Sequence, residues 1–456
     1  MTSKFFVENS IGELINKFAK KEFSPVDAVR AALENIRELD PKYFAWVVSA
    51  DEALLKRIEK ETTQFGIDPA RLLEGIPVGV KDIYNTADFP TQMGSPLWKD
   101  FTPGNDARAV YHLKRQGANV VGKTVTAEFA VHALGKTLNP YDTTKTPGTS
   151  SSGSAVAVAL GMVPVATGTQ TAGSIVRPAS FCGVYGCKPS FGTIPRTGML
   201  KTTDSLDQVG FLTIHQEDLR RVFDALRVKG ENYPISNAAF SDVARQSKPA
   251  IRPWRIGFAR THTWGGVPPY AKDQMEAFVA GLAKEKDIEV TDALLPAEMQ
   301  KTHEIHQIIY DKSLAYYFKR EYKQSDFVSP IMNEIIARGN ATGIPAFHEA
   351  LAAQNNLIYA MDEYFQNFDI IISLSTAGEA PPREQIELPD PALMWTLTHL
   401  PVVSVPQFKS LRGLPFGMQV VARKYNDHLL FAFLDDLRAR ELIPSKAGYF
   451  LRDVSK

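Results

Sequence analysis

Residues 146–178 read TPGTSSSGSAVAVALGMVPVATGTQTAGSIVRP and carry the strongest structural signal in the chain. Two clusters rich in Gly, Ser and Thr, at 146–154 and 168–178, enclose a run of small apolar residues. Because unpaired polar backbone is costly beside core-like segments, we interpret both clusters as built turns rather than flexible linkers. Consecutive small residues also let backbone N–H groups face a ligand, which is typical of an anion or oxyanion site.

Around this stretch, short β-branched runs alternate with helical patterns and predict a layered α/β sheet. The expected strands are 76–80, 119–121, 162–165, 255–258, 288–291, 369–374, 402–405 and 418–421. The first 65 residues predict helices, the second of which begins at Ser24-Pro25 because Ser caps a helix and Pro suits its first turn. A further helix is expected over 270–285.

No composition shift marks a linker, so we expect one domain over 1–456. Its first parts are an N-terminal helical segment (1–65) and a core that holds the catalytic residues (75–215). A variable, largely helical and substrate-facing region follows (228–365), and C-terminal strands and a helix complete the core (366–456). Residues 228–252 are polar and predict a surface excursion, and 301–365 are mainly helical and rich in aromatic residues.

Composition excludes several classes of protein. The 456 residues carry 51 Lys plus Arg and 51 Asp plus Glu, so the formal net charge is zero. A protein that holds nucleic acid or an anionic membrane normally has a basic excess, and we expect neither partner. The only two cysteines, Cys182 and Cys187, fit a reducing compartment. Without a recognisable signal peptide or a long apolar span, the expected location is the cytoplasm.

Two motifs suggest a phosphate-binding loop and a metal site, but their sequence context favours neither. GANVVGKT at 117–124 fits the phosphate-binding loop pattern, yet its β-branched centre favours a strand over a phosphate-cradling loop. His303 and His306 lie on one face of a predicted helix, but no further ligand with metal-site spacing accompanies them, so we expect surface or packing roles. The serine-hydrolase pattern G-x-S-x-G is absent from the chain.

Several pieces of the chain together resemble the amidase signature hydrolases. They are GIPVGVKD (75–82), GKT (122–124), the two Gly/Ser-rich clusters, FCGVYGCKP (181–189) and SLDQVG (205–210). The resemblance covers nearly the full length and is closest from 75 to 210. It implies the α/β/α fold of that family, in which helices cover both faces of a mixed central β-sheet.

The resemblance also implies a catalytic triad of two serines and a lysine. By motif match Ser174 is the nucleophile, Ser150 is the bridging serine and Lys81 is the base. The chemistry fits, because a serine hydroxyl needs a base and a lysine can serve if burial keeps it neutral. Lys81 follows an apolar strand, which favours burial. On the residues alone, a lysine whose head reaches the surface remains the alternative.

The family pattern further implies an oxyanion hole made by the backbone N–H groups of Thr171, Ala172, Gly173 and Ser174. It implies a cis peptide bond before the bridging serine, here Thr149–Ser150. This chain departs from the usual string at four positions. Asp is replaced by Gln170, and Gly is replaced by Thr149, Ser152 and Ala172. Because none of the triad residues changes, we expect the departures to affect fine specificity more than the reaction.

The expected function is therefore cleavage of amide C–N bonds through an acyl-enzyme, with esters and carbamates (urethanes) as further substrates and no cofactor or metal. Aromatic residues in 301–365 predict that some face an uncharged, apolar or aryl substrate. Two alternatives stay open. One is the A subunit of a tRNA-dependent glutamine amidotransferase, which shares the family and works in a complex; the other is a binding module without catalysis. A homodimer, common among relatives, also stays open.

Overall fold

One mixed β-sheet of eleven strands runs through the computed structural model, which describes residues 4–385 and 389–447. The strand order is β1-β3-β2-β4-β6-β5-β10-β11-β9-β7-β8. The strands are β1 Trp46–Ser49, β2 Pro77–Lys81, β3 Asn119–Thr124, β4 Val165–Gln170, β5 Tyr185–Lys188, β6 Gln208–Thr213, β7 Trp254–Phe258, β8 Ile288–Asp292, β9 Ile370–Leu374, β10 Val402–Lys409 and β11 Pro415–Ala422. The mixed sheet of the expected α/β fold is confirmed.

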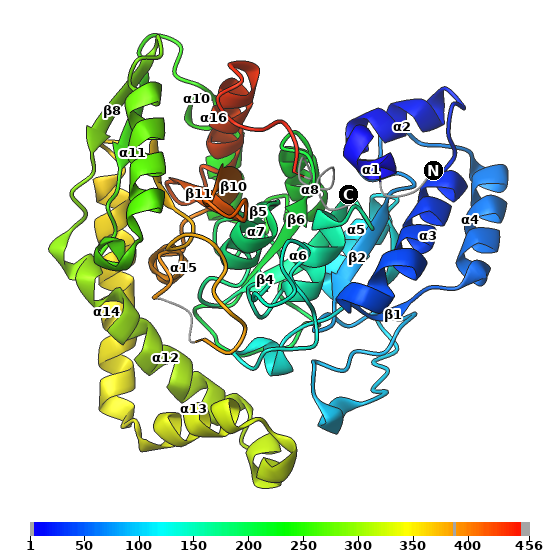
Figure 1. Cartoon of the computed structure of the whole chain (residues 1–456), viewed down its shortest axis with the longest axis horizontal. Helices are drawn as coiled ribbons and strands as arrows, with labels where there is room; N and C mark the ends of the chain where they lie inside the picture. The colour runs from blue at the N-terminus through cyan, green and yellow to red at the C-terminus, as the bar shows by residue number, and fades with distance from the viewer. Residues whose placement is uncertain (1–3, 386–388, 448–456) are drawn as a thin grey trace.

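Helices connect these strands, and Figure 1 shows them distributed around the sheet. They are α1 Phe5–Glu8, α2 Ile11–Ala19, α3 Pro25–Tyr43, α4 Glu52–Phe65, α5 Arg108–Arg115, α6 Ser152–Ala159, α7 Val176–Cys182, α8 Asp218–Leu226, α9 Pro234–Ser241, α10 Val243–Gln246, α11 Pro269–Leu282, α12 Thr302–Tyr317, α13 Pro330–Ala341, α14 Ile344–Tyr364, α15 Leu393–Leu397 and α16 Asp427–Ala439. Helix α3 begins as expected, since the Ser24 hydroxyl accepts from the N–H of Asp27 and Pro25 occupies the first turn.

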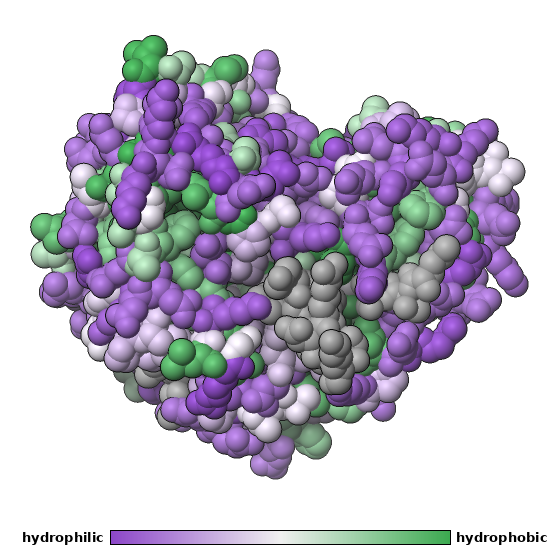
Figure 2. Space-filling model, turned by 45° about the horizontal axis from the view of Figure 1, so that its top comes forward, coloured by the Kyte–Doolittle hydropathy of each residue, from purple (hydrophilic) through white to green (hydrophobic). Residues whose placement is uncertain are grey.

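The central strands lie in the core of the molecule. Every residue of β2, β4, β5 and β6 is buried, so both faces of this part of the sheet are covered. Helix α6 is buried along its whole length, which its small residues allow. On the face shown in Figure 2 hydrophilic residues dominate, and hydrophobic ones form scattered groups. Among the described helices, none has the length and apolar character needed to cross a membrane.

Two expected elements differ from the structure. The strand predicted over 162–165 begins only at Val165 and continues to Gln170, because Gly161 ends α6 in the left-handed region and Pro164 lacks an N–H. The first 65 residues are not wholly helical, since β1 pairs antiparallel with β3 at one end of the sheet. The surface excursion over 228–252 is largely exposed, as expected, and contains α9 and α10.

The sheet brings the expected catalytic segments to one edge. Strands β2 and β4 are parallel neighbours, with Val78 opposite Val165 and Gly79 opposite Ala166. Because the carboxyl ends of parallel strands share an edge, Lys81 at the end of β2 lies beside the end of β4. Helix α6 begins within the first Gly/Ser-rich cluster, at Ser152, and α7 begins within the second, at Val176. Helices α12, α13 and α14 form an extension at the lower left of Figure 1.

Candidate active site

Lys81 ends β2 with its side chain fully buried. Three hydroxyl oxygens surround its Nζ, those of Ser150 at 2.7 Å, Thr169 at 2.8 Å and Ser151 at 3.0 Å. Thr169 comes from β4, whereas both serines immediately precede α6. Hydroxyl groups can accept from an amine or donate to it, so this cage can hold a neutral lysine with all its hydrogen bonds made.

The pKa of Lys81 lies well below the ordinary lysine value because burial disfavours its charged form. The negative charge of Asp207 opposes this effect and is the smaller influence. Among the described residues no carboxylate forms an ion pair with Lys81. The burial expected from the apolar strand is therefore confirmed, and the surface alternative is wrong.

Ser150 lies in a turn whose backbone geometry differs from the expected one. No cis peptide bond occurs in the described part of the chain, so the prediction of a cis Thr149–Ser150 bond is wrong for this structure. The chain instead reverses through positive φ angles at Gly148 (98°) and Thr149 (71°). This turn brings the Ser150 hydroxyl within 2.7 Å of Lys81 Nζ.

Ser174 lies between β4 and α7, in the segment 171–174 that leaves the sheet edge. Its side chain is 8% exposed, and within the described chain it forms no hydrogen bond to Ser150 or Lys81. The structure thus brings Lys81 and Ser150 into contact and leaves the hydroxyl of Ser174 unengaged. The expected link between the two serines is not formed here.

The backbone of 171–174 presents a run of unused donors. None of the N–H groups of Thr171, Ala172, Gly173 and Ser174 donates to another residue in the described ranges 4–385 and 389–447. Of these four residues Thr171 is partly exposed and the other three are buried. A run of N–H groups without a protein partner that ends at a serine can receive an oxyanion. A Cβ at Gly173 would lie 1.7 Å from Oδ2 of Asp390, so only glycine fits there.

Gln170, which replaces the usual acidic residue, anchors this segment at both ends. Its side-chain oxygen accepts from the N–H groups of Ile175 (2.8 Å) and Val176 (3.0 Å), at the start of α7. Its amide nitrogen donates to the hydroxyl of Thr396 on α15 at 2.9 Å. The neutral side chain therefore supports the helix end that follows Ser174.

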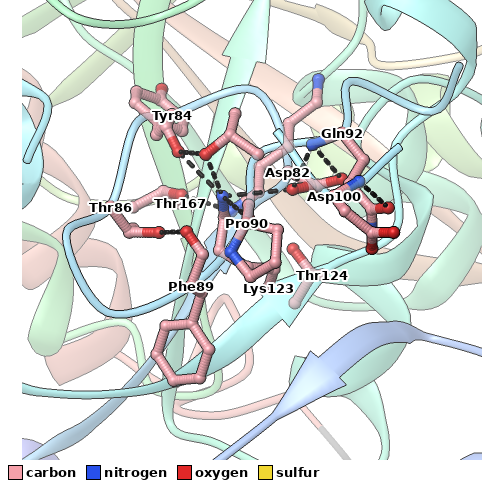
Figure 3. A network of polar contacts seen from close by, with 12 residues as sticks. Asp82, Tyr84, Thr86, Phe89, Pro90, Gln92, Asp100, Lys123, Thr124 and Thr167 are labelled. Atoms are coloured by element: carbon pink, nitrogen blue, oxygen red, sulfur yellow. Dashed lines mark hydrogen bonds and ion pairs between the residues drawn. The ribbon is translucent and has the colours of Figure 1, made fainter. Parts of the chain in front are cut away.

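The phosphate-loop pattern at 117–124 has a structural role, in keeping with its β-branched centre. Lys123 belongs to β3, and its buried Nζ lies 3.1 Å from Asp82 and donates to the carbonyls of Tyr84 and Pro90 (Figure 3). Burial lowers the pKa of Lys123 to about 8, an effect that the charge of Asp82 opposes. This ion pair fixes the loop that follows Lys81.

A cavity of about 490 Å³ adjoins the segment 171–174. Thr149 and Ala172 form part of its wall, and α12 and α13 form much of the rest. Two arginines of its wall pair with aspartates, Arg177 with Asp390 at 3.1 Å and Arg338 with Asp311 at 2.9 Å, and the wall also includes the exposed carboxylate of Glu384. Its apolar surface comes from Leu134, Tyr310, Ile331, Ile335 and Leu393. Within the described residues, no three His, Cys, Asp or Glu side chains are placed to hold a metal.

Several residues of this site escape sequence reasoning. His306, expected at the surface or in packing, lies in the cavity wall and bonds to the carbonyl of Thr171. The region 301–365 has ten aromatic residues, some of them expected to face substrate, and Tyr310 is the one that lines the cavity. Arg177 and Asp390 are also missed, although Arg177 lies within the second Gly/Ser-rich cluster and is the nearest signal to them.

Comparison with known proteins identifies the family of the chain. The model of the Amidase family matches residues 27–431. The A subunit of glutamyl-tRNA(Gln) amidotransferase from Listeria monocytogenes is 28% identical, over 92% of this chain and 95% of its own. A crystal structure of an amidase is 25% identical with a TM-score of 0.82, over 94% of this chain and 99% of its own.

The peptide amidase of Stenotrophomonas maltophilia shares the fold. Its TM-score is 0.81 at 24% identity, over 98% of this chain and 99% of its own. Together with the family match over 27–431, these likenesses show that the chain belongs to the Amidase family and is an enzyme that acts on amide C–N bonds.

Proposed function

We propose that this enzyme hydrolyses small amides through an acyl-enzyme formed on Ser174, with Lys81 as the base and Ser150 as the proton relay. The observation that carries the proposal is the cage of three hydroxyls around Lys81, which is fully buried and forms no ion pair with a carboxylate of the described chain. A lysine in this setting loses its proton readily and can activate a serine at neutral pH.

The contacts of Lys81 support a direction for the relay. A neutral amine donates two hydrogen bonds and accepts one. The Ser151 hydroxyl is placed to donate to the carbonyl of Thr169 at 3.3 Å, so it accepts from Lys81. If the Thr169 hydroxyl is the second acceptor, the lone pair of Lys81 faces Ser150 at 2.7 Å. Ser150 can then give its proton to Lys81 while it takes one from Ser174.

The proposed reaction requires the Ser174 hydroxyl, which is unengaged in this structure, to hydrogen-bond to Ser150 when substrate is bound. Ser174 Oγ attacks the carbonyl carbon as its proton passes through Ser150 to Lys81, and the N–H groups of 171–174 stabilise the oxyanion. When the C–N bond breaks, the same proton returns through Ser150 to the leaving amine. Water then attacks the acyl-enzyme by the same route and frees the acid. Esters and carbamates present a comparable carbonyl to this machinery.

The cavity favours an uncharged substrate with apolar or aryl parts. Its arginines and aspartates neutralise each other in pairs, so neither arginine of the wall is free for an anionic substrate, and the exposed carboxylate of Glu384 would repel one. The aromatic face of Tyr310 and the side chains of Ile331 and Ile335 offer apolar contact. We therefore infer that anilides, aryl-alkyl amides and aryl carbamates are better substrates than free glutamine or acetamide.

The test is turnover of 4-nitroacetanilide and 4-nitrophenyl butyrate by the isolated chain. Ser174→Ala should lose roughly three orders of magnitude or more in kcat because the nucleophile is gone. Ser152→Ala is the matched control, a serine of the neighbouring cluster outside the proposed relay, and should stay near the parent rate. Retention of more than a tenth of the rate in Ser174→Ala would refute the nucleophile assignment.

A second candidate is supported by the amidotransferase relatives. Their name describes one component of a larger enzyme, and the relative from Listeria monocytogenes matches 92% of this chain. On this candidate the chain would act on free glutamine and need partner proteins. A panel of anilide, carbamate, acetamide and glutamine substrates separates the two: preference for glutamine, or activity only with added partners, would replace the proposed amidase.

A further inference from the structure

The segment 171–174 is held through its carbonyl groups by residues far away in the chain. The carbonyl of Thr171 accepts from Nε2 of His306 on α12 at 2.8 Å. The next carbonyl, that of Ala172, accepts from the hydroxyl of Thr396 on α15 at 2.6 Å. These two donors come from different helices and reach successive peptide groups.

Each of these bonds also fixes an N–H group. A trans peptide is planar, and its C=O and N–H point in opposite directions, so holding one sets the direction of the other. The bond to Thr171 therefore sets the N–H of Ala172, and the bond to Ala172 sets the N–H of Gly173. Both N–H groups are among the unused donors of the proposed oxyanion hole.

We propose that His306 and Thr396 are positioning residues that aim the N–H groups of Ala172 and Gly173 at the oxyanion of the tetrahedral intermediate. This inference rests on the proposed function of the segment. It gives α12 a role in the rate of reaction, in addition to its place in the cavity wall.

The surroundings of His306 suit a fixed donor. Its side chain is buried and stacks on Tyr310, with ring centroids 5.4 Å apart. Because a carbonyl oxygen can only accept, Nε2 must carry the proton. Burial lowers the pKa of His306 to about 4, so the ring stays neutral and keeps this tautomer at neutral pH.

The surroundings of Thr396 explain why this chain carries Gln170. The amide nitrogen of Gln170 donates to the Thr396 hydroxyl at 2.9 Å, which leaves the hydroxyl proton free for Ala172. The competing acceptor within α15, the carbonyl of Ala392, lies farther away at 3.5 Å. A carboxylate at position 170 could only accept, and it would draw that proton away from Ala172. Gln170 and Thr396 thus form a matched pair.

The test compares variants that remove a donor with variants that keep one. His306→Phe preserves the stacking ring and Thr396→Val preserves the shape, and each loses its donor. His306→Gln and Thr396→Ser keep one. Gln170→Glu keeps an acceptor for the N–H groups at the start of α7 and replaces the donor to the Thr396 hydroxyl with an acceptor. The measurements are kcat and KM for 4-nitrophenyl butyrate, the pH profile, and thermal unfolding.

We expect kcat to fall roughly 10- to 100-fold in His306→Phe, Thr396→Val and Gln170→Glu, somewhat less than the loss of a whole oxyanion donor. KM should stay within about twofold, because the donors act on the transition state rather than on bound substrate. The acid limb of the pH profile should not move, since Lys81 is unchanged. His306→Gln and Thr396→Ser should recover most of the rate.

Several outcomes would overturn the inference. A rise in KM at constant kcat would make His306 a wall residue only, and equal losses in the donor-keeping variants would make the role purely structural. Full activity of His306→Phe and Thr396→Val while Ser174→Ala is inactive would reject this inference and leave the proposed function standing. An active Ser174→Ala would reject the proposed function itself.

If the ester is not turned over, labelling of Ser174 by an alkyl fluorophosphonate gives the same comparison. Ser174 Oγ forms a bond to phosphorus, fluoride leaves, and the serine proton passes to the base, while the phosphoryl oxygen occupies the oxyanion site. Slower labelling in the donor-lacking variants supports the inference. Unchanged labelling rejects it, and absence of label on Ser174 in the parent protein rejects the proposed function.

Discussion

Lys81 and Lys123 lie on adjacent strands and are both buried, yet their surroundings differ. Within the described chain the Nζ of Lys81 has only hydroxyl partners, whereas that of Lys123 faces the carboxylate of Asp82 at 3.1 Å as well as two backbone carbonyls and the hydroxyl of Thr91 (Figure 3). Burial lowers the pKa of both. A carboxylate opposes the shift at Lys123, which stays near 8, and only the more distant charge of Asp207 opposes it at Lys81.

The comparison of Lys81 with Lys123 indicates that burial alone does not make a lysine a base. With a carboxylate partner a buried lysine remains a cation at neutral pH and acts as a structural tie. With hydroxyl partners no adjacent carboxylate offsets the effect of burial, so the pKa falls further and the neutral amine, which can take up a proton, is favoured. We therefore expect substitution of Lys81 to lower the rate of catalysis and substitution of Lys123 to lower the stability of the fold.

The largest expected effect is that of Lys81→Met on turnover. Removal of the base should lower kcat by roughly 10⁴-fold, the size seen when one member of a catalytic triad is lost. The variant should still unfold cooperatively, because the methionine fills a similar volume. The measurement is kcat on 4-nitroacetanilide beside a thermal unfolding curve. A folded Lys81→Met that keeps a tenth of the parent rate would break the comparison.

Lys123→Met should act on stability instead. It leaves the Asp82 carboxylate buried without its partner, which typically costs about 3–5 kcal/mol in the free energy of unfolding. Urea unfolding measures this loss, and the double variant Asp82→Asn/Lys123→Met is the control that should recover part of it. If Lys123→Met were as stable as the parent and lost activity to the same degree as Lys81→Met, the two lysines would not have separate roles.

The smallest expected effect is that of Ser151→Ala. This change removes one acceptor from Lys81 and leaves Ser150 and Thr169 in place. We expect kcat to fall by about 10-fold, in keeping with loss of a supporting hydrogen bond rather than of a reacting group. The Ser151 hydroxyl accepts from Lys81 and so favours the charged amine. Its removal should lower the pKa of Lys81 and move the acid limb of the pH profile to lower pH. A loss as large as that of Ser150→Ala would instead make Ser151 a relay residue.

The sequence predicts part of this site well. Lys81, Ser150 and Ser174 stand in motifs with characteristic neighbours, and the burial of Lys81 follows from the apolar strand before it. The position of β4 is predicted poorly, because all of this strand after Val165, ATGTQ at 166–170, lacks the apolar β-branched run that marks a strand.

Other features depend on the tertiary fold and leave no local signal. His306 lies 135 positions from Thr171, and Thr396 lies 224 positions from Ala172. A lone histidine on a helix and a threonine in a short helix are common in any chain. Their meaning comes from the packing of α12 and α15 against the segment 171–174. The backbone at Thr149 is another such feature, since residue type alone does not indicate a positive φ there.

The most direct test of the central claim is the pH dependence of kcat/KM for 4-nitrophenyl butyrate. The base acts when neutral, so activity should rise with pH through the pKa of Lys81, which burial holds well below 10.5. We predict a single ionisation in the acid limb, present in Lys123→Met and absent from the residual rate of Lys81→Met. A limb at the ordinary lysine value, or one that persists unchanged in Lys81→Met, would contradict the account.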